Sequence, residues 1–149
     1  MHEKRNKQDN KYGRKKFPPS RVPKYNFSYT LKPQEEQLKT DPLMLTMIEA
    51  RAEKADNPYR PIYHYVNPEN KLNDPTGLCY WQGLWHLFYQ VKPPEEDRPH
   101  WGHAVSKDLT HWRYLPYALY PEPENACYSG TVLVEKKSGS SHVSRHRNW

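Results

Sequence analysis

Apolar residues follow a regular period in the middle of this chain and none at its two ends. Residues 1–40 mix charged, proline and polar side chains without apolar periodicity, which predicts a basic, largely disordered leader. Residues 136–149 are polar, basic and rich in Ser, so we expect an unstructured tail. Folded structure is therefore predicted between residues 41 and 135.

Residues 41–57 follow the helical period. Met44, Met47 and Ile48 recur at a spacing that places them on one face of a helix. Asp41 can cap the first turn, and the proline after it suits the first helical position. An Asn-Pro pair closes the segment, which predicts one short helix.

From Tyr59 onward the period is two. Aromatic and aliphatic runs alternate with turn residues, and Gln82-Gly83 joins the first two runs, which predicts a β-hairpin. The expected strands cover residues 78–81, 85–90, 103–106, 111–115 and 131–135. Antiparallel strands at this spacing are typical of a sandwich or a propeller, so we predict an all-β domain over residues 58–135.

Charge and aromatic content change at the same boundary. The formal net charge is +6, but residues 1–24 alone hold nine Lys and Arg against two acidic residues. Fourteen of the 20 aromatic residues lie between Tyr59 and Tyr128. A basic leader can contact phosphates, yet this one has few aromatic residues and no nucleic-acid-binding fold follows it. We therefore expect no nucleic-acid partner and a near-neutral, aromatic-rich folded part.

Membrane, secretion and metal signals are weak in this sequence. No run approaches the about 18 apolar residues of a spanning helix, and the basic N-terminus has no apolar h-region of a signal peptide. The compartment and the oligomeric state stay open. The two cysteines lack the spacing of a zinc site, and His100, His103 and His111 have no carboxylate or Cys at ligand spacing. We expect no metal, no cofactor and no membrane partner.

The segment Asn73-Asp74-Pro75-Thr76-Gly77 is the best candidate for chemistry. A carboxylate at the start of a strand, facing a cleft walled by Trp and Tyr, suits nucleophilic or electrostatic work on a sugar. The same residues also make a good turn with no function at all. The motif alone leaves both interpretations open.

Four blocks of sequence taken together favour the sugar chemistry: LNDPTGLCYWQGLWHLFYQ, WGHAVSKDLTHW, LPYALYPE and YSGTVLVE. In this order and at these distances they resemble glycoside hydrolase family 32, the invertases, inulinases and fructan hydrolases, over roughly residues 61–135. The resemblance implies a five-bladed β-propeller, of which this stretch would form the first blade and the start of the second. It also implies a retaining hydrolase of β-fructofuranosyl linkages in sucrose, inulin or levan.

The resemblance assigns roles to particular residues. Asp74 would be the nucleophile that attacks the anomeric carbon of fructose and forms a covalent fructosyl-enzyme. The fructose pocket would be lined by Asn73, Gln90, Trp101, Tyr128 and Ser129. Asn, Gln and Ser can hydrogen-bond a polyhydroxylated ring, while Trp offers an apolar face for stacking. The expected partner is a fructose-containing oligo- or polysaccharide.

One part of the family pattern does not occur in the sequence. A retaining mechanism needs a second carboxylate about 5–5.5 Å from the nucleophile. The family supplies this acid in a Glu-Cys motif and a further Asp in Arg-Asp-Pro, and neither motif is present here. We expect the chain as given to be a truncated piece of the catalytic domain, from a fragment or a frameshifted gene, and inactive alone. The alternative is a non-catalytic remnant that binds fructan.

Overall fold

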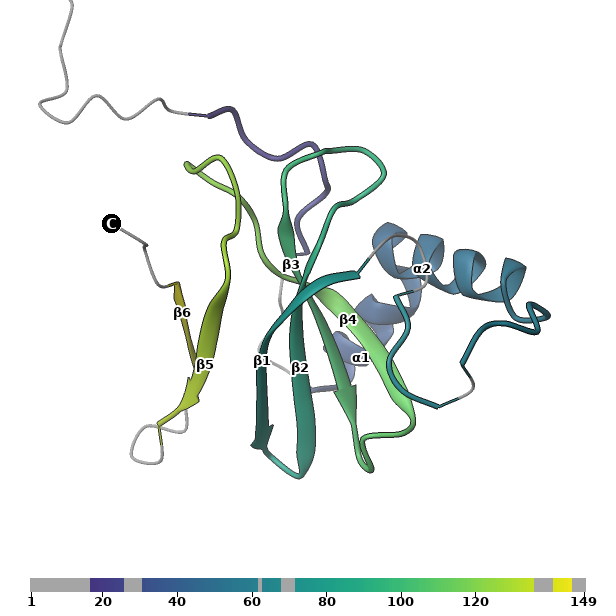
Figure 1. Cartoon of the computed structure of the whole chain (residues 1–149). Helices are drawn as coiled ribbons and strands as arrows, with labels where there is room; N and C mark the ends of the chain where they lie inside the picture. The colour runs from purple at the N-terminus through teal and green to yellow at the C-terminus, as the bar shows by residue number, and fades with distance from the viewer. Residues whose placement is uncertain (1–16, 26–30, 62, 68–71, 136–140, 146–149) are drawn as a thin grey trace, which may run out of the picture.

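The computed structural model describes residues 17–25, 31–61, 63–67, 72–135 and 141–145. In this part of the chain, two helices precede a four-stranded and a two-stranded antiparallel sheet (Figure 1). No helix in the described ranges is both long and apolar enough to cross a membrane. The first sixteen residues of the predicted leader lie outside the described residues.

A helix, α2, spans Pro42–Glu53 within the range of the predicted helix, and it ends somewhat earlier than expected. The side chain of Asp41 accepts a hydrogen bond from the Met44 backbone N–H at 3.1 Å, so it caps the helix as predicted. Met44 and Met47 are buried, whereas Ile48 is 53% exposed. The buried face is therefore narrower than the sequence pattern implied.

A second helix, α1, spans Leu31–Thr40 inside the stretch that was expected to be disordered. That expectation is wrong for these ten residues. This segment is rich in Gln, Glu, Leu and Lys, which form helices readily. It has no apolar stripe, so the search for a helical period missed a helix that the intrinsic propensities favour.

The larger sheet is an antiparallel meander, with strand order β1-β2-β3-β4. Its strands are β1 (Leu72–Trp81), β2 (Leu84–Val91), β3 (His100–Ser106) and β4 (Trp112–Leu119). The hairpin between β1 and β2 is confirmed. Gln82 and Gly83 have φ of 48° and 81°, and two left-handed residues make the tight turn that matches the twist of paired strands. This meander has the strand arrangement of one propeller blade, while the number of blades stays a prediction.

The smaller sheet pairs β5 (Gly130–Val134) with β6 (Ser141–Arg145). The expectation of an unstructured tail is wrong for residues 141–145, while residues 136–140 and 146–149 lie outside the described residues. The hydrogen bonds that pair β5 with β6 join backbone groups, so they do not require apolar side chains. The exposed backbone of β5 can therefore recruit a polar segment that composition alone predicts to be unpaired.

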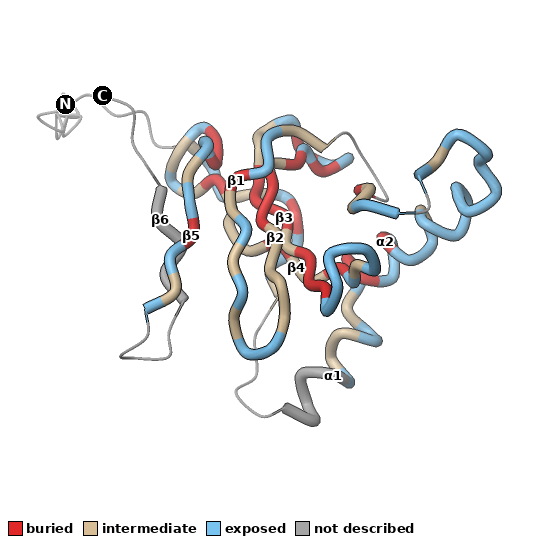
Figure 2. The backbone as a smooth tube through the Cα atoms, turned by 60° about the horizontal axis from the view of Figure 1, so that its bottom comes forward, coloured by how far each residue is buried: buried red, intermediate tan, exposed pale blue. Residues whose placement is uncertain are grey.

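Each face of the four-stranded sheet packs on a different partner. One face carries Tyr89, Val91 and Tyr114 against the Leu43, Met44 and Met47 side chains of α2. The opposite face carries Phe88 and Trp101 against Cys127 and Val132, the latter on β5. Figure 2 shows buried residues through β3 and at the start of α2, and a mixture of exposed, intermediate and buried residues along β5. The sheet is thus covered by helices on one side and by the second sheet on the other.

Met47 is 1% exposed and lies at the centre of the helix–sheet core. We expect Met47→Ala to lower the free energy of unfolding by about 2–5 kcal/mol, because it removes buried surface and leaves a cavity. Ile48→Ala, on the exposed side of the same helix, should change it by less than about 1 kcal/mol. Urea unfolding followed by circular dichroism measures both, and equal losses would contradict the orientation of α2.

Candidate active site

The candidate nucleophile lies where the two sheets meet. Asp74 is exposed at the irregular start of β1, where the pairing with β2 shifts register on either side of Pro75. The Ser129 hydroxyl, just before β5, donates a hydrogen bond to Asp74 Oδ2 at 2.9 Å. This bond joins the start of β1 to the residue before β5 and fixes one oxygen of the carboxylate. The structure therefore brings together two of the predicted site residues, Asp74 and Ser129, which lie 55 positions apart.

A glycine allows this close approach of the sheets. A Cβ atom on Gly77 would lie 2.6 Å from Cγ2 of Val132 on β5. Atoms at that distance overlap, so only glycine fits here without moving β5. The glycine that ends the Asn-Asp-Pro-x-Gly motif is thus explained by packing between the sheets.

Gln90 and Trp101 both hold the segment that leads to Ser129. They face each other across β2 and β3. Gln90 Nε2 donates to the Cys127 carbonyl at 2.8 Å, and Trp101 Nε1 donates to the Tyr128 carbonyl at 2.9 Å. Two consecutive backbone carbonyls are therefore fixed by side chains from the larger sheet. These contacts place Ser129 beside Asp74.

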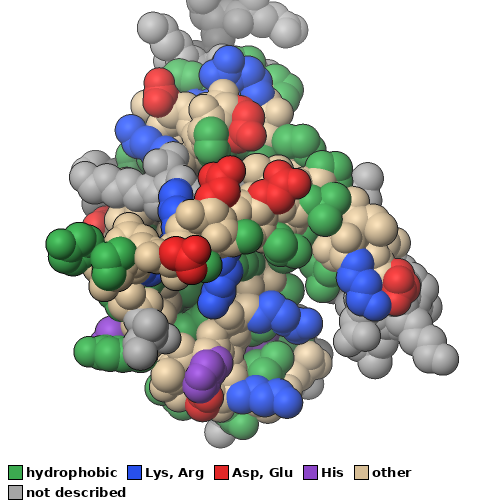
Figure 3. Space-filling model, turned by 90° about the vertical axis from the view of Figure 1, so that its right-hand side faces the viewer, with side chains coloured by type: hydrophobic (Ala, Val, Ile, Leu, Met, Phe, Trp, Pro, Cys, Tyr) green, Lys and Arg blue, Asp and Glu red, His purple; other side chains and the backbone are tan. Residues whose placement is uncertain are grey.

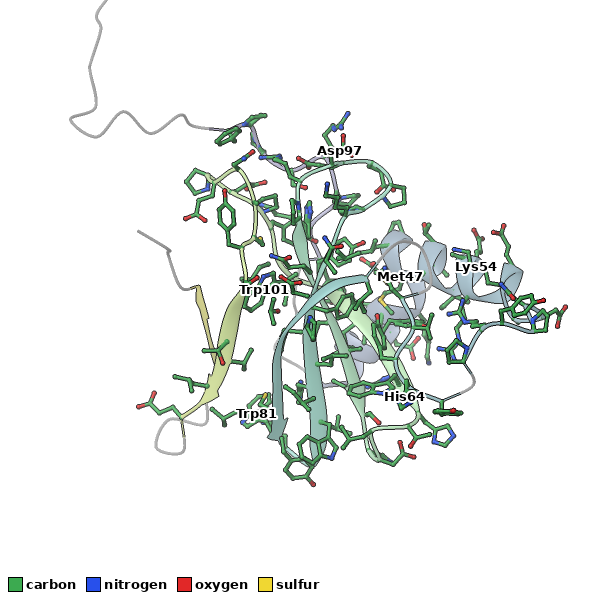
Figure 4. The ribbon with its side chains drawn as sticks, in the orientation of Figure 1. Met47, Lys54, His64, Trp81, Asp97 and Trp101 are labelled. Atoms are coloured by element: carbon green, nitrogen blue, oxygen red, sulfur yellow. The ribbon has the colours of Figure 1, made fainter. Side chains whose placement is uncertain are left out.

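The structure gives Trp101 a different surrounding from the one the sequence suggested. Its side chain is 0% exposed and lies between the two sheets (Figure 4), so it offers no face on which a sugar could stack. Tyr128, by contrast, is 55% exposed, and Asn73 is half-buried next to Asp74. The exposed part of the predicted pocket is therefore formed by Asp74, Tyr128 and Ser129.

Sequence reasoning gave no functional weight to Thr76, which follows Asp74 by two positions. Thr76 is 5% exposed, and its Oγ1 has no hydrogen-bond partner among the described residues. A buried hydroxyl without a partner costs free energy and is uncommon. The one feature of the sequence that pointed to Thr76 was its position inside the Asn-Asp-Pro-x-Gly motif.

Residues 17–24, which we call the strap, pack against loops that border this site. Arg98 donates from Nη1 and Nη2 to the Pro18 and Pro19 carbonyls at 2.9 and 3.3 Å. The same guanidinium binds the Glu96 carboxylate through Nε. Glu96 in turn accepts from the Arg21 backbone N–H at 3.0 Å. The expectation of a disordered leader is therefore wrong for the strap as well.

A buried histidine completes the contacts of the strap. His100 is 0% exposed; its Nδ1 lies 2.8 Å from the Arg98 carbonyl, and its Nε2 lies 2.7 Å from Ser20 Oγ. Because a carbonyl only accepts, Nδ1 carries the proton and Nε2 accepts from the Ser20 hydroxyl. His100 directly precedes Trp101, whose indole holds the segment before Ser129. The strap therefore contacts the neighbour of a residue that positions the candidate site.

Acid is expected to weaken the strap. Burial alone would raise the pKa of Glu96, but hydrogen bonds from Arg98, Arg21 and Ser20 outweigh it and lower the pKa to about 2. Burial lowers the pKa of His100. A pKa that is lower in the folded chain than in the unfolded chain, for a carboxyl or for an imidazole, means that folding favours the deprotonated form. Both groups therefore stabilise the fold at neutral pH. This stabilisation begins to be lost as the pH falls below about 6.5 for His100, and it is lost from about 4.5 towards 2 for Glu96.

Unfolding free energies measured between pH 7 and pH 3 check this expectation. Glu96→Gln should cost about 3 kcal/mol at pH 7, because it removes the carboxylate partner of the largely buried Arg98, and it should flatten the acid part of the profile. Glu95→Gln, an exposed neighbour, should leave the profile unchanged. A steep acid transition that persists in Glu96→Gln would place its origin elsewhere.

Two further histidines are packed between the sheets, beside Phe88. His86 Nδ1 lies 3.0 Å from His103 Nε2, and the His103 ring stacks on Phe88 with centroids 4.3 Å apart. Burial, together with the neighbouring His86, lowers the pKa of His103 to about 3. Within the described ranges, no three His, Cys, Asp or Glu side chains are placed to share a metal ion. These imidazoles are neutral packing groups.

Known proteins resemble this chain in both sequence and structure. Residues 64–144 match the family model of the glycosyl hydrolases family 32 N-terminal domain. The levanase of Bacillus subtilis is 47% identical over 87 residues, which are 57% of this chain and 13% of the levanase. The acid β-fructofuranosidase of Solanum lycopersicum is 49% identical over 80 residues, which are 50% of this chain and 13% of that enzyme.

A solved structure agrees with these matches. The GH32 β-fructofuranosidase of Bombyx mori superposes with a TM-score of 0.51 at 38% identity, over 71% of this chain and 22% of that protein. The chain thus spans less than a quarter of the length of the relatives named here. Its antiparallel sheets are consistent with the β-propeller of the family's N-terminal domain. The resemblance expected from the four sequence blocks is confirmed, and the chain belongs to glycosyl hydrolases family 32.

Proposed function

We propose that this chain provides the nucleophile of a β-fructofuranosidase-type glycoside hydrolase that acts on sucrose, inulin or levan with retention of configuration. The observation that carries the proposal is the hydrogen bond from Ser129 to Asp74 at the junction of the two sheets. It holds an exposed carboxylate in one orientation, as a nucleophile in a sugar site requires. The names of the relatives, a levanase and a β-fructofuranosidase, support the fructosyl substrate.

The proposed chemistry follows from how the carboxylate is held. The Ser129 hydroxyl occupies Oδ2, which leaves Oδ1 to attack the anomeric carbon. The new C–O bond forms as the glycosidic C–O bond breaks, and the leaving oxygen takes a proton from a general acid. Water then hydrolyses the fructosyl ester and returns the Asp74 carboxylate. The half-buried Asn73 and Gln90 and the exposed Tyr128 would hydrogen-bond the sugar hydroxyls.

The general acid is the group that this chain would have to receive from elsewhere. The printed sequence contains no Glu-Cys and no Arg-Asp-Pro. Without a proton donor the leaving group departs as a poor alkoxide, so the 149-residue chain by itself should not turn over sucrose or fructan. A non-catalytic fructan-binding remnant is the less favoured alternative, because the relatives named above are hydrolases.

A chimeric enzyme tests the proposal. Residues 64–144 would replace the corresponding segment of the Bacillus subtilis levanase, which then supplies the rest of its catalytic domain. We expect the chimera to release fructose from levan or sucrose, with the β-anomer appearing first by NMR. A folded chimera without hydrolysis, or one that releases the α-anomer first, would overturn the proposal. The isolated chain, assayed in parallel, should release none.

A further inference from the structure

A small basic cavity lies beside the C-terminal part of α2, away from the Asp74 site. Its volume is about 110 Å³, and its lining includes Arg51, Arg60, His64 and His111. Figure 4 labels His64 in the segment that follows α2, and Figure 3 views the molecule from this side, where Lys and Arg side chains lie near a histidine. None of these residues was given a function by the sequence blocks.

Strand register separates this cavity from the candidate active site. Trp112, which also lines the cavity, pairs with Ser106, and Ser106 pairs with Trp85 next to the β1–β2 turn. Asp74 lies at the other end of β1, where Leu72 pairs with Val91. The two sites are therefore at opposite ends of the sheet. A ligand in one does not contact the other.

The lining itself contains two arginines and no acidic side chain, while Asp108 contacts one of its histidines, His111, from outside the cavity. Arg51 and Arg60 both border the cavity, and neither takes part in an ion pair among the described residues. Two guanidinium groups on the lining of one cavity repel each other, and an anion bound between them would offset that repulsion. Guanidinium groups bind oxyanions well, because their fork of N–H donors matches two oxygen atoms at once.

Hydrogen bonds orient two of these groups. Arg51 Nη1 donates to the Tyr114 hydroxyl at 2.7 Å, and its guanidinium lies 5.4 Å from the centroid of that ring. Asp108 accepts from His111 Nδ1 at 2.7 Å and from the His111 backbone N–H at 2.7 Å. Because Nδ1 donates to Asp108, Nε2 of the neutral ring is an acceptor, and His111 borders the cavity without donating to an anion. Preorganised donors lose less entropy on binding, which favours a specific site.

The backbone of His64 adds an independent indication. Its φ is 75°, in the left-handed region that non-glycine residues rarely adopt. Such conformations cost about 1–3 kcal/mol and cluster at functional sites. The strained residue here is one of the four basic residues of the lining.

We propose that this cavity binds a small tetrahedral oxyanion, a phosphate group, between Arg51 and Arg60, with His64 as a further donor. The cavity is smaller than the about 300–1,000 Å³ of sites that enclose a whole drug-sized ligand, so it suits the anion and not a disaccharide. The phosphate comes either from free inorganic phosphate or from a phosphate monoester whose remaining part stays in solvent. Both sources share the same recognition chemistry.

Calorimetric titration of the 149-residue chain with inorganic phosphate at constant ionic strength tests the proposal. We expect saturable binding that Arg60→Ala weakens at least about tenfold, because a charge-assisted contact contributes roughly 1.5–3 kcal/mol. Arg60→Lys should restore part of the affinity. Glycerol phosphate distinguishes the sources: equal binding indicates recognition of the phosphate group alone, and tighter binding indicates a phosphate ester.

The matched control is Arg113→Ala, which removes an exposed arginine from β4 outside this cavity and should leave binding unchanged. Equal weakening by Arg113→Ala and Arg60→Ala would show charge screening only and overturn the proposal, as would the absence of saturable binding. Asp74→Asn should also bind phosphate normally. A failure of the proposed hydrolase function therefore leaves this result unaffected.

Discussion

Asp74→Asn in the levanase chimera is expected to lower kcat by about 10⁴–10⁶-fold, the loss seen when a covalent nucleophile is removed from an enzyme. The amide has nearly the shape of the carboxylate, and its oxygen can still accept from Ser129. The fold should therefore stay intact, while the negative charge that attacks the anomeric carbon is gone. Initial rates on levan and sucrose, with circular dichroism as the folding check, measure the effect.

Ser129→Ala provides the comparison for this experiment. It removes one hydrogen bond to the carboxylate and leaves the nucleophile, so we expect a loss of about 10–100-fold. The two variants thus separate the loss of the attacking carboxylate from the loss of its orientation. Residual activity of Asp74→Asn at or above that of Ser129→Ala would show that another residue attacks the sugar.

Trp101→Ala is expected to cost about 3–5 kcal/mol of unfolding free energy, which is comparable with the total stability of many domains. The ring is fully buried between the sheets and packs on Phe88, Cys127 and Val132. Its removal leaves a cavity and also deprives the Tyr128 carbonyl of its donor. Soluble yield and urea unfolding of the full chain report the loss.

Two further variants test why Trp101 matters. Trp101→Phe retains most of the apolar volume but lacks the Nε1 donor, so it should retain most of the stability and still loosen the segment before Ser129. Trp85→Ala, on the half-buried hairpin end, should cost clearly less than Trp101→Ala. A similar cost for Trp85 and Trp101 would contradict a special role for the junction between the sheets.

Local patterns predicted the central part of the fold well. The Gln82-Gly83 turn and the alternating residues around it specify the hairpin, because turn type and side-chain period act between near neighbours. The capped helix that starts at Pro42 was found for the same reason. The strap was missed, because its contacts join Ser20 to His100 and Arg21 to Glu96, which are 80 and 75 residues apart. No local pattern encodes such contacts.

The candidate site was likewise predicted only in part. Asp74 and Ser129 were named together from the sequence blocks, and the structure brings them within hydrogen-bond distance. The burial of Trp101 could not be foreseen, because a tryptophan next to glycine suits a sugar-binding wall and a core position equally well. Only the packing of β5 against the larger sheet decides between the two.

The hydrogen bond between Asp74 and Ser129 also has a consequence for the order of events during protein synthesis. The two residues are 55 positions apart, so at about 5–20 residues per second the ribosome adds Ser129 about 3–11 s after Asp74. A hairpin needs only microseconds to form, so β1 and β2 can pair once Val91 has left the ribosome, before Ser129, further along the chain, has emerged. The carboxylate is thus presented on a finished hairpin and acquires its orientation later, when the nascent chain returns to the edge of β1.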